Sequence, residues 1–384
     1  MRYLWYSMYA FVTALALYSL FFSPSRRGRR PVAPPPAVET PSVVEPRPVV
    51  DAAQADVQIA LLLDTSSSMD GLIEQARVQL WEIVAELQID DNDKPRQVEV
   101  ALYQYGNSRL AERDGFIERL SELTPELDPV SIQLHSLSTS GGKEYAPLAI
   151  SRAVDELAWS DDDSVERVIV VAGNEGFGQG PLSAESAMEK ARARGIKVVT
   201  VFCANGGATS TGLNSWERAA QLASTDLKTI DPDKVVEKLE TPYDADLVAK
   251  YKALEATRLT YGEPTYQREV ESANFTVASM SAGSSVAVQA DRAVAQSRQG
   301  GRADLSQDLT VQLEQVPSDQ LPSALQGLSK PEQIEVVQQR RQERTQIQAE
   351  IAALSAKRRH HIKGMAAPSA APSLGSSVRE ALAR

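Results

Sequence analysis

The apolar run VQIALLLD, residues 57–64, stops at a carboxylate and is followed at once by the serine-rich segment TSSSMD. A near-continuous apolar run of this length is typical of a strand that is buried on both faces of a sheet. A helical pattern begins near Leu72, so the segment predicts a strand, a tight loop and a helix. Such a strand would leave Asp64 at the carboxyl edge of a parallel sheet, where ligands of open α/β sheets lie.

The same alternation continues along the chain. Further strands are expected at 98–106, 165–173, 197–204 and 227–231, and helices are expected at 72–87, 146–159, 184–194, 213–223 and 233–239, with shorter helical segments at 116–123 and 130–137. Apolar strands separated by amphipathic helices predict an α/β fold, a doubly wound, mainly parallel sheet with helices on both faces.

Asp64, Ser66 and Ser68 form the pattern D-x-S-x-S. Two hydroxyls spaced by two residues can turn toward the point where the carboxylate ends. This set suits Mg²⁺, which keeps several waters and needs only a few protein oxygens. The alternative is that the serines only cap the following helix, since serine and aspartate are favoured at helix N-termini.

The D-x-S-x-S spacing between a strand and a helix resembles the metal-ion-dependent adhesion site of von Willebrand factor A (VWA) domains. The resemblance implies a bound Mg²⁺, Mn²⁺ or Ca²⁺ and a protein partner, whose acidic side chain commonly completes the metal's coordination. In that family a second loop supplies a threonine after two glycines, and a third loop supplies an aspartate. Here Lys143 follows Gly141 and Gly142, and Asn174 stands where the aspartate would be.

Three interpretations of this departure are open. In the first, a neighbouring glutamate supplies the missing oxygen, so the candidate metal ligands are Asp64, Ser66, Ser68, Glu144, Asn174 and Glu175, and the candidate ligand-binding residues beside them are Thr65, Ser140 and Lys143. In the second, the Lys143 ammonium occupies or neighbours the metal position and neutralises Asp64, because a buried carboxylate without a counter-charge is unfavourable. In the third, the loops are polar and have no ionic role.

The two ends of the chain do not follow the alternation of strands and helices. Residues 3–22 carry no charge and are aromatic at both ends, which predicts a membrane anchor at 1–24, with a buried core helix as the alternative. Residues 25–55 are a proline-rich linker, 56–240 the VWA domain and 241–384 a helical, partly disordered region. Within the last region, 331–359 has apolar positions that suit either a short coiled coil and self-association or a solvated single helix.

Charge and resemblance disagree on the compartment. The arginines at 26, 27, 29 and 30 follow the span, which favours a cytoplasmic head by the positive-inside rule. VWA proteins with a run similar to LLLDTSSSMDGLIEQA behind an N-terminal apolar segment look like bacterial cell-envelope proteins, and we therefore expect a single-pass protein with a periplasmic or cell-surface head, with a cytoplasmic head as the alternative. A formal net charge of −11 argues against nucleic acid as a partner.

These observations favour a membrane-tethered binding module that recognises a protein partner through a divalent cation. The alternative is a structural or assembly protein, with a metal-free VWA head and C-terminal helices that mediate association. An enzyme is not expected, because the chain has no G-x-S-x-G motif and no general base is paired with Asp64.

Overall fold

The computed structural model describes residues 55–89, 94–204, 209–235, 238–299, 303–307, 313–365 and 372–382. The expected anchor at 1–24 lies outside these residues, as does the linker up to residue 54. Within the described part of the chain, no helix is both long and apolar enough to cross a membrane.

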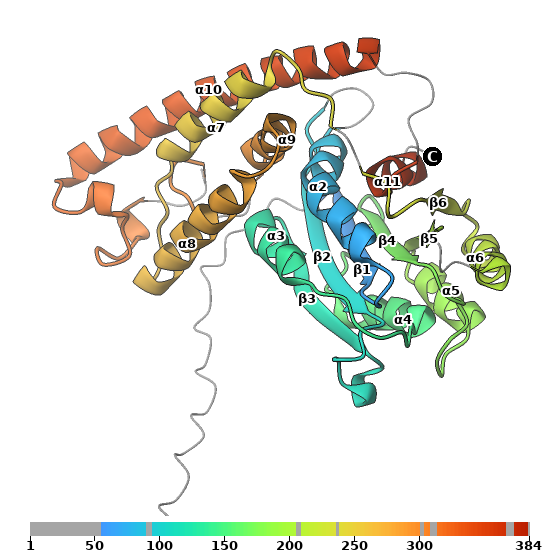
Figure 1. Ribbon diagram of the computed structural model, residues 1–384. Coiled ribbons are helices and arrows are strands. Elements are labelled where there is room, and N and C mark those ends of the chain that lie inside the picture. The colour runs from blue at the N-terminus through green and yellow to red at the C-terminus, as the bar shows by residue number, and fades with distance from the viewer. Residues whose placement is uncertain are drawn as a thin grey trace, which may run out of the picture. The chain divides into compact units, whose positions relative to one another are not determined.

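A mixed sheet stands at the centre of the described residues, with six strands in the order β3-β2-β1-β4-β5-β6 (Figure 1). The strands are β1 (Val57–Asp64), β2 (Val98–Tyr105), β3 (Ile117–Thr124), β4 (Glu166–Gly173), β5 (Lys197–Cys203) and β6 (Lys228–Ile230). Neighbouring strands are parallel except β2 and β3, which are antiparallel. The expectation of a mainly parallel sheet is confirmed.

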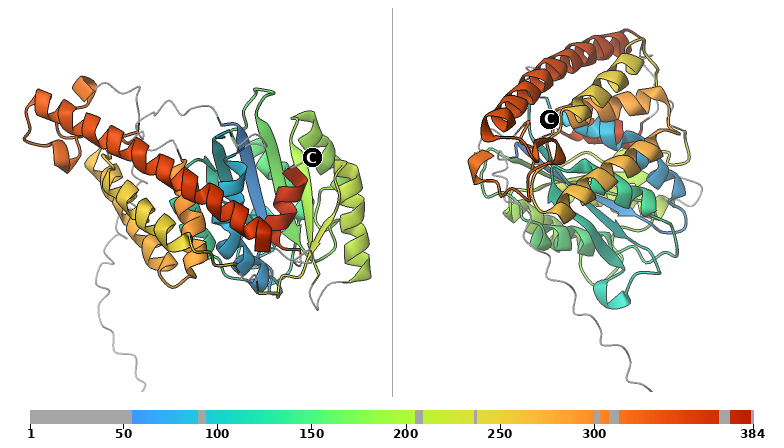
Figure 2. Two further views of the ribbon diagram at one scale, coloured as in Figure 1. Left: turned by 90° about the horizontal axis from the view of Figure 1, so that it is seen from above. Right: turned by 90° about the vertical axis from the view of Figure 1, so that its left-hand side faces the viewer.

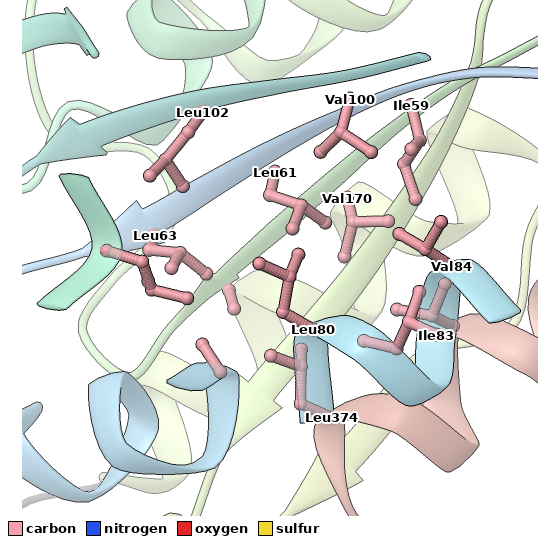
Figure 3. Packing of buried hydrophobic residues seen from close by; sticks show 14 of the residues in the cluster. Ile59, Leu61, Leu63, Leu80, Ile83, Val84, Val100, Leu102, Val170 and Leu374 are labelled. Atoms are coloured by element: carbon pink, nitrogen blue, oxygen red, sulfur yellow. The ribbon is translucent and has the colours of Figure 1, made fainter. Parts of the chain in front are cut away.

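Helices cover both faces of this sheet (Figure 2). One face carries α2 (Asp70–Leu87), α3 (Leu127–Ser136) and α11 (Leu374–Leu382), and the other carries α4 (Ala146–Glu156), α5 (Ala184–Ala193) and α6 (Ser210–Ala223). Alternate residues of β1 serve the two faces: Leu61 packs with Leu80 of α2 (Figure 3), whereas Leu62 packs on the side of α4 and α5. Burial on both faces explains why β1 is apolar throughout.

Two local predictions were wrong. The helical segment expected at 116–123 is instead the antiparallel edge strand β3, which begins at residue 117. Gly115 and Phe116 both have positive φ, 69° and 56°, and this turn directs the chain back along β2. The helix expected at 233–239 is absent from its described residues, where the carbonyl of Lys234 accepts a hydrogen bond from Gln75 Nε2 at 3.3 Å.

The C-terminal region forms four long helices, α7 (Asp244–Ala256), α8 (Pro264–Ser281), α9 (Val286–Ser297) and α10 (Lys330–Met365). Residues 272–304 are rich in serine, alanine and glycine, and they include the second half of α8 and all of α9. Their alanines are informative, because Ala287, Ala290 and Ala293 are fully buried and let α9 approach its neighbours closely.

The expected helix at 331–359 is present within α10, which runs along α7 (Figure 2). Its apolar positions Ile347 and Ile351 are buried against Leu247 and Leu254 of α7 and against α9. These two apolar residues of α10 are therefore covered by helices of the same chain and are not exposed to a second copy.

Buried ion pairs join these helices to the sheet domain. Arg358 of α10 donates from Nε to Asp244 Oδ1 and from Nη1 to Asp291 Oδ1, each at 2.6 Å. Lys238 lies 3.0 Å from Asp291 Oδ2 and also pairs with Glu82 of α2. This buried ion network therefore connects α2, α7, α9 and α10.

Replacing Arg358 with leucine should destabilise the protein strongly, because it would leave Asp244 and Asp291 buried without their shared cation. Loss of one partner of a buried ion pair costs about 3–5 kcal/mol. Arg340→Ala is the control, since its pair with Glu343 is exposed and such pairs contribute about 1 kcal/mol or less. Urea unfolding measures both variants, and equal losses would contradict a structural role for the network.

Candidate functional site

The candidate site lies where the order of the strands reverses. From β1 the chain continues to β2 on one side, and β4 pairs with β1 on the other side. The loops that follow β1 and β4 therefore leave the same edge of the sheet, and the loop before α4 joins them there. This is the edge at which doubly wound sheets bind ligands.

Backbone hydrogen bonds fasten the first two loops together. Ser67 N donates to Gly141 O at 2.9 Å, and Gly141 N donates to Ser67 Oγ at 2.8 Å. Ser140 N donates to Thr65 O at 3.0 Å. Gly141 has a φ of +75°, and a Cβ there would lie 1.6 Å from Ser108 Oγ, so only glycine fits. Ser67 thus connects the loop after β1 to the loop before α4, a role that the D-x-S-x-S pattern does not indicate.

Asp64 is completely buried at the end of β1. Its Oδ1 accepts a hydrogen bond from Ser66 N at 2.7 Å, whereas its Oδ2 has no hydrogen-bond partner. Glu144 is 3% exposed, and its Oε1 likewise has none. Two glycines make room for these carboxyl groups, because a Cβ on Gly106 would lie 2.6 Å from Asp64 Oδ1 and one on Gly173 would lie 3.2 Å from Oδ2.

Burial raises the pKa of Asp64 well above its ordinary value, and the charge of Glu144 and a hydrogen bond to it raise that pKa further. Burial also raises the pKa of Glu144, to which the charge of Glu175 contributes in the same direction. The hydrogen bond to Asp64 has the opposite effect from burial, because it lowers the pKa of Glu144. The two raised pKa values mean that the pair keeps a proton to a higher pH than free carboxyl groups do, because two buried charges side by side are unfavourable.

Lys143 does not neutralise Asp64, so the second interpretation of the departure from the family pattern was wrong. Its side chain is 53% exposed, and its ammonium lies 3.6 Å from Glu112 Oε1 and 5.2 Å from the centroid of the Phe116 ring. Lys143 pairs with Gly106 in an extended bridge. Successive side chains in extended backbone point to opposite sides, so Glu144 turns inward when Lys143 turns outward.

The hydroxyls and the amide lie beside the carboxyl pair. Ser66 Oγ is 3.5 Å from Ser68 Oγ, and Asn174 Nδ2 donates to Ser68 Oγ at 3.0 Å. Glu175 is exposed at the rim, where it accepts a hydrogen bond from Gln179 Nε2 at 2.7 Å. The N-cap residue of α2 is Met69, whose side chain makes no capping hydrogen bond.

The remaining candidates support the loops. Thr65 Oγ1 donates to the carbonyl of Tyr105 at 3.1 Å and to Gln104 Oε1 at 3.2 Å, and Ser140 acts through its backbone. Sequence reasoning missed Tyr105, which is buried beside Asp64 and donates from its hydroxyl to Ala172 O at 2.9 Å. Gly106 directly follows β2, and it is the sequence signal that could have pointed to Tyr105.

The donor set fits a hard divalent cation. Among the described residues no group of three or more His, Cys, Asp and Glu side chains is arranged to hold a metal. The oxygens of Asp64, Ser66, Ser68 and Glu144 are instead a mixture of carboxylate and hydroxyl, which suits Mg²⁺ or Mn²⁺. The two buried oxygens without a donor, on Asp64 and Glu144, are where a cation would remove an unfavourable charge.

In the presence of EDTA, the contribution of the Asp64–Glu144 pair to the free energy of unfolding should fall as the pH rises. The raised pKa of the Asp64–Glu144 pair means that native protein keeps a proton that unfolded chains lose near about pH 4. The stabilising contribution is therefore complete below about that pH and is lost as the pH rises through the native pKa.

Glu144→Gln should flatten this pH dependence and stabilise the protein at neutral pH, by about 1.4 kcal/mol for each unit by which the pKa is raised. Glu189→Gln, at an exposed position of α5, is the matched control and should keep the wild-type profile. Urea unfolding between about pH 4 and pH 8 spans the range of interest. A Glu144→Gln profile as steep as that of the wild type would contradict the raised pKa of the pair.

Part of this chain is similar to a known protein family and to several solved structures. No curated protein matches the sequence. Solved structures similar to it include BatB from Bacteroides thetaiotaomicron, at 17% identity and a TM-score of 0.34 over 46% of this chain and 90% of that chain. An aerotolerance-related membrane protein from Bacteroides fragilis is similar at 16% identity and a TM-score of 0.32, over 46% of this chain and 93% of that chain.

A third similar structure is that of proximal thread matrix protein 1 from the mussel byssus, described with a zinc-occupied MIDAS motif. Its identity is 16% and its TM-score 0.35, over 47% of this chain and 42% of that chain, so the match spans less than half of the mussel protein. The sequence model of the von Willebrand factor type A domain matches residues 58–228, from β1 to the start of β6, which includes every loop of the candidate site. Residues 58–228 of this chain therefore form a von Willebrand factor type A domain.

Proposed function

We propose that this protein is a membrane-tethered binding module that recognises a protein partner through a divalent cation at the carboxyl edge of its sheet. VWA domains are a family of protein-interaction modules, which supports the general role. The observation that carries the proposal is the buried pair of Asp64 and Glu144, whose inward oxygens lack donors beside the hydroxyls of Ser66 and Ser68.

Each residue has a distinct part in this proposal. Asp64 and Glu144 supply negative charge, and Ser66 and Ser68 supply neutral oxygens. Asn174 orients the hydroxyl of Ser68 through its hydrogen bond. A bound divalent cation would supply the positive charge that replaces the proton kept by the pair and a coordination position open to a partner's oxygen.

The surface beside the site is concave and suits a protein partner. A hollow of about 570 Å³ lies between the start of α2 and the end of α3. Asp70, Glu74 and Arg77 contribute charged groups to it, and Leu137 contributes an apolar side chain. Thr139 donates to Asp70 Oδ1 at 2.6 Å, which ties the loop before α4 to this hollow. A partner that reaches the cation would contact both surfaces together.

A second candidate is a structural or assembly protein whose VWA head binds no metal. The raised pKa of Asp64 beside Glu144 offers a way to reduce the buried charge without a cation. The buried ion network of Arg358, Asp244, Asp291, Lys238 and Glu82 also makes the head and the helices one folded unit, as an assembly protein would need.

Calorimetric titration with Mg²⁺ or Mn²⁺ separates the two candidates. The proposed site should bind one cation, and at about a hundred times the dissociation constant binding stabilises the fold by about 2.7 kcal/mol. Asp64→Asn and Glu144→Gln should each weaken binding by roughly tenfold or more, since each removes a charged ligand. Lys143→Ala is the matched control, because this side chain points away from the pair.

The same variants test partner recognition. Protein that the full chain retains from detergent-solubilised membranes should be released by EDTA, and Asp64→Asn should retain none of it while Lys143→Ala retains it fully. Absence of heat with both cations would favour the metal-free assembly protein. Retention by Asp64→Asn equal to that of the wild type would mean that the partner binds elsewhere.

The proposal of membrane tethering comes from the uncharged sequence of residues 3–22. The full chain should stay with membranes after washing with alkali, because an apolar helix of this length is held by the hydrocarbon core. Protease should degrade a cell-surface head in intact cells, and a periplasmic head once the outer membrane has been opened. A head that is protected after the outer membrane has been opened but cleaved after lysis would lie in the cytoplasm, as the arginines after the span favour.

A further inference from the structure

The last turns of α10 carry exposed cations that lie outside the VWA domain. Residues 351–379 contain five lysines or arginines, two histidines and no acidic residue, in a chain whose formal net charge is −11. Arg358 belongs to the buried ion network, whereas Lys357, His360 and Lys363 are exposed. Among the described residues, no carboxylate pairs with Lys357 or Lys363. We call Lys357, His360, Lys363 and Met365 the cationic end of α10.

The helix itself explains only part of this charge. A helix C-terminus attracts cations within its last turn, because the carbonyl groups there carry partial negative charge. Lys357 lies about two turns before Met365, the residue at which α10 ends. Met365 is 54% exposed and places an apolar side chain two residues after Lys363. Exposed cations beside an exposed apolar side chain are typical of protein surfaces that lie against anionic membranes.

The cationic end of α10 lies at the amino edge of the sheet, opposite the proposed cation site. Helix α2 starts beside the site loops and ends at this edge, where Arg96 N, just before β2, donates to Gln88 O at 2.8 Å. Arg298 donates to Ala85 O in the last turn of α2 at 2.9 Å and to Ser355 Oγ of α10 at 3.4 Å. These bonds hold the last turns of α10 against the end of α2 (Figure 1).

The chain also enters the sheet at the amino edge. Asp56 N donates to Gln97 O at 2.9 Å, and β1 begins at the next residue, Val57, which pairs with Val98 at the start of β2. The sequence before the domain, with the uncharged residues 3–22, is therefore joined to the edge that carries the cationic end of α10.

We propose that the cationic end of α10 binds the anionic lipid headgroups of the membrane to which the chain is tethered. The inference rests on the proposed tether, which keeps a membrane surface within reach. Exposed lysines need no complementary cavity there, because a layer of lipid phosphates offers negative charge at every position. The acidity of the whole chain disfavours nucleic acid as the partner. Binding turns the carboxyl edge of the sheet, with the proposed cation site, away from the membrane.

Energy transfer between the head and the lipids tests this proposal. Cys203 is the only cysteine and is buried, so a cysteine introduced at the exposed Ala356 takes a fluorescent donor selectively. The full chain is reconstituted in vesicles of phosphatidylcholine, or of phosphatidylcholine and phosphatidylglycerol in equal parts, with an acceptor dye on some headgroups. Transfer should be higher in the anionic vesicles. It should fall to the neutral level in about 1 M salt, where the Debye length is about 3 Å.

A charge variant locates the contact. Lys357→Gln combined with Lys363→Gln should lower the ratio of docked to free heads by about thirtyfold, at about 1 kcal/mol for each lysine. Arg113→Gln combined with Lys330→Gln is the matched control, because it removes the same charge from the loop after β2 and from the far end of α10. The control should show the transfer of the wild type.

Two results would overturn the proposal. Equal transfer in neutral and anionic vesicles would exclude lipid binding and favour an acidic protein as the partner of these cations. Wild-type transfer in the Lys357 and Lys363 variant would place the contact elsewhere. Failure of the tether is separate, since the chain would then leave neutral vesicles on washing with alkali. In that case, flotation of the wild type with the anionic vesicles alone, lost in the same variant, would still support the proposal.

Discussion

The burial of one carboxylate, that of Asp64 at the end of the central strand, is the constraint to which the rest of the site responds. A charged group removed from water must be paired, protonated or coordinated. The chain meets this requirement with the amide of Ser66, with a raised pKa beside Glu144 and with glycines at 106 and 173 that leave room for the side chain. Hydrogen bonds between the loops hold them in place. The side chains proposed to ligate the metal are therefore positioned before a cation binds.

Glu144 supplies the second carboxylate of the site, which the family pattern takes from the third loop, where this chain has Asn174. With Glu144 in place of a threonine, two buried carboxylates face the same point. In the proposed function, a divalent cation would be neutralised fully by this pair, whereas a site with one carboxylate leaves a net positive charge. We therefore expect the two carboxylates to hold the cation firmly.

The VWA domain and the C-terminal helices are connected through buried charge as well as through apolar contact. Arg358 lies between Asp244 and Asp291, and Lys238 joins Asp291 to α2 of the VWA domain. Removal of any one partner leaves another buried charge uncompensated, so these elements are expected to unfold together. Free energy gained at the carboxyl edge of the sheet would consequently stabilise the C-terminal helices as well.

The sequence by itself determined the features that depend on local pattern. The apolar run of β1, the alternation of strands and helices and the D-x-S-x-S spacing identified the sheet, its parallel character and the position of Asp64, because side-chain period and strand ends are local properties. Asn174 was also placed correctly beside the serines, since it directly follows the neighbouring strand β4.

Tertiary structure alone decided which side chain enters the site and which elements cover one another. Lys143 and Glu144 are adjacent in sequence, and the extended pairing of Lys143 with Gly106 turned the glutamate inward. Residues 117–124 became a strand because β2 offered an unpaired edge, and the stripe of α10 found its partners in α7 and α9. These outcomes depend on contacts between segments that are distant in the chain. Such contacts compete with the local preference for helix or strand, and the periodicity of the sequence does not reveal them.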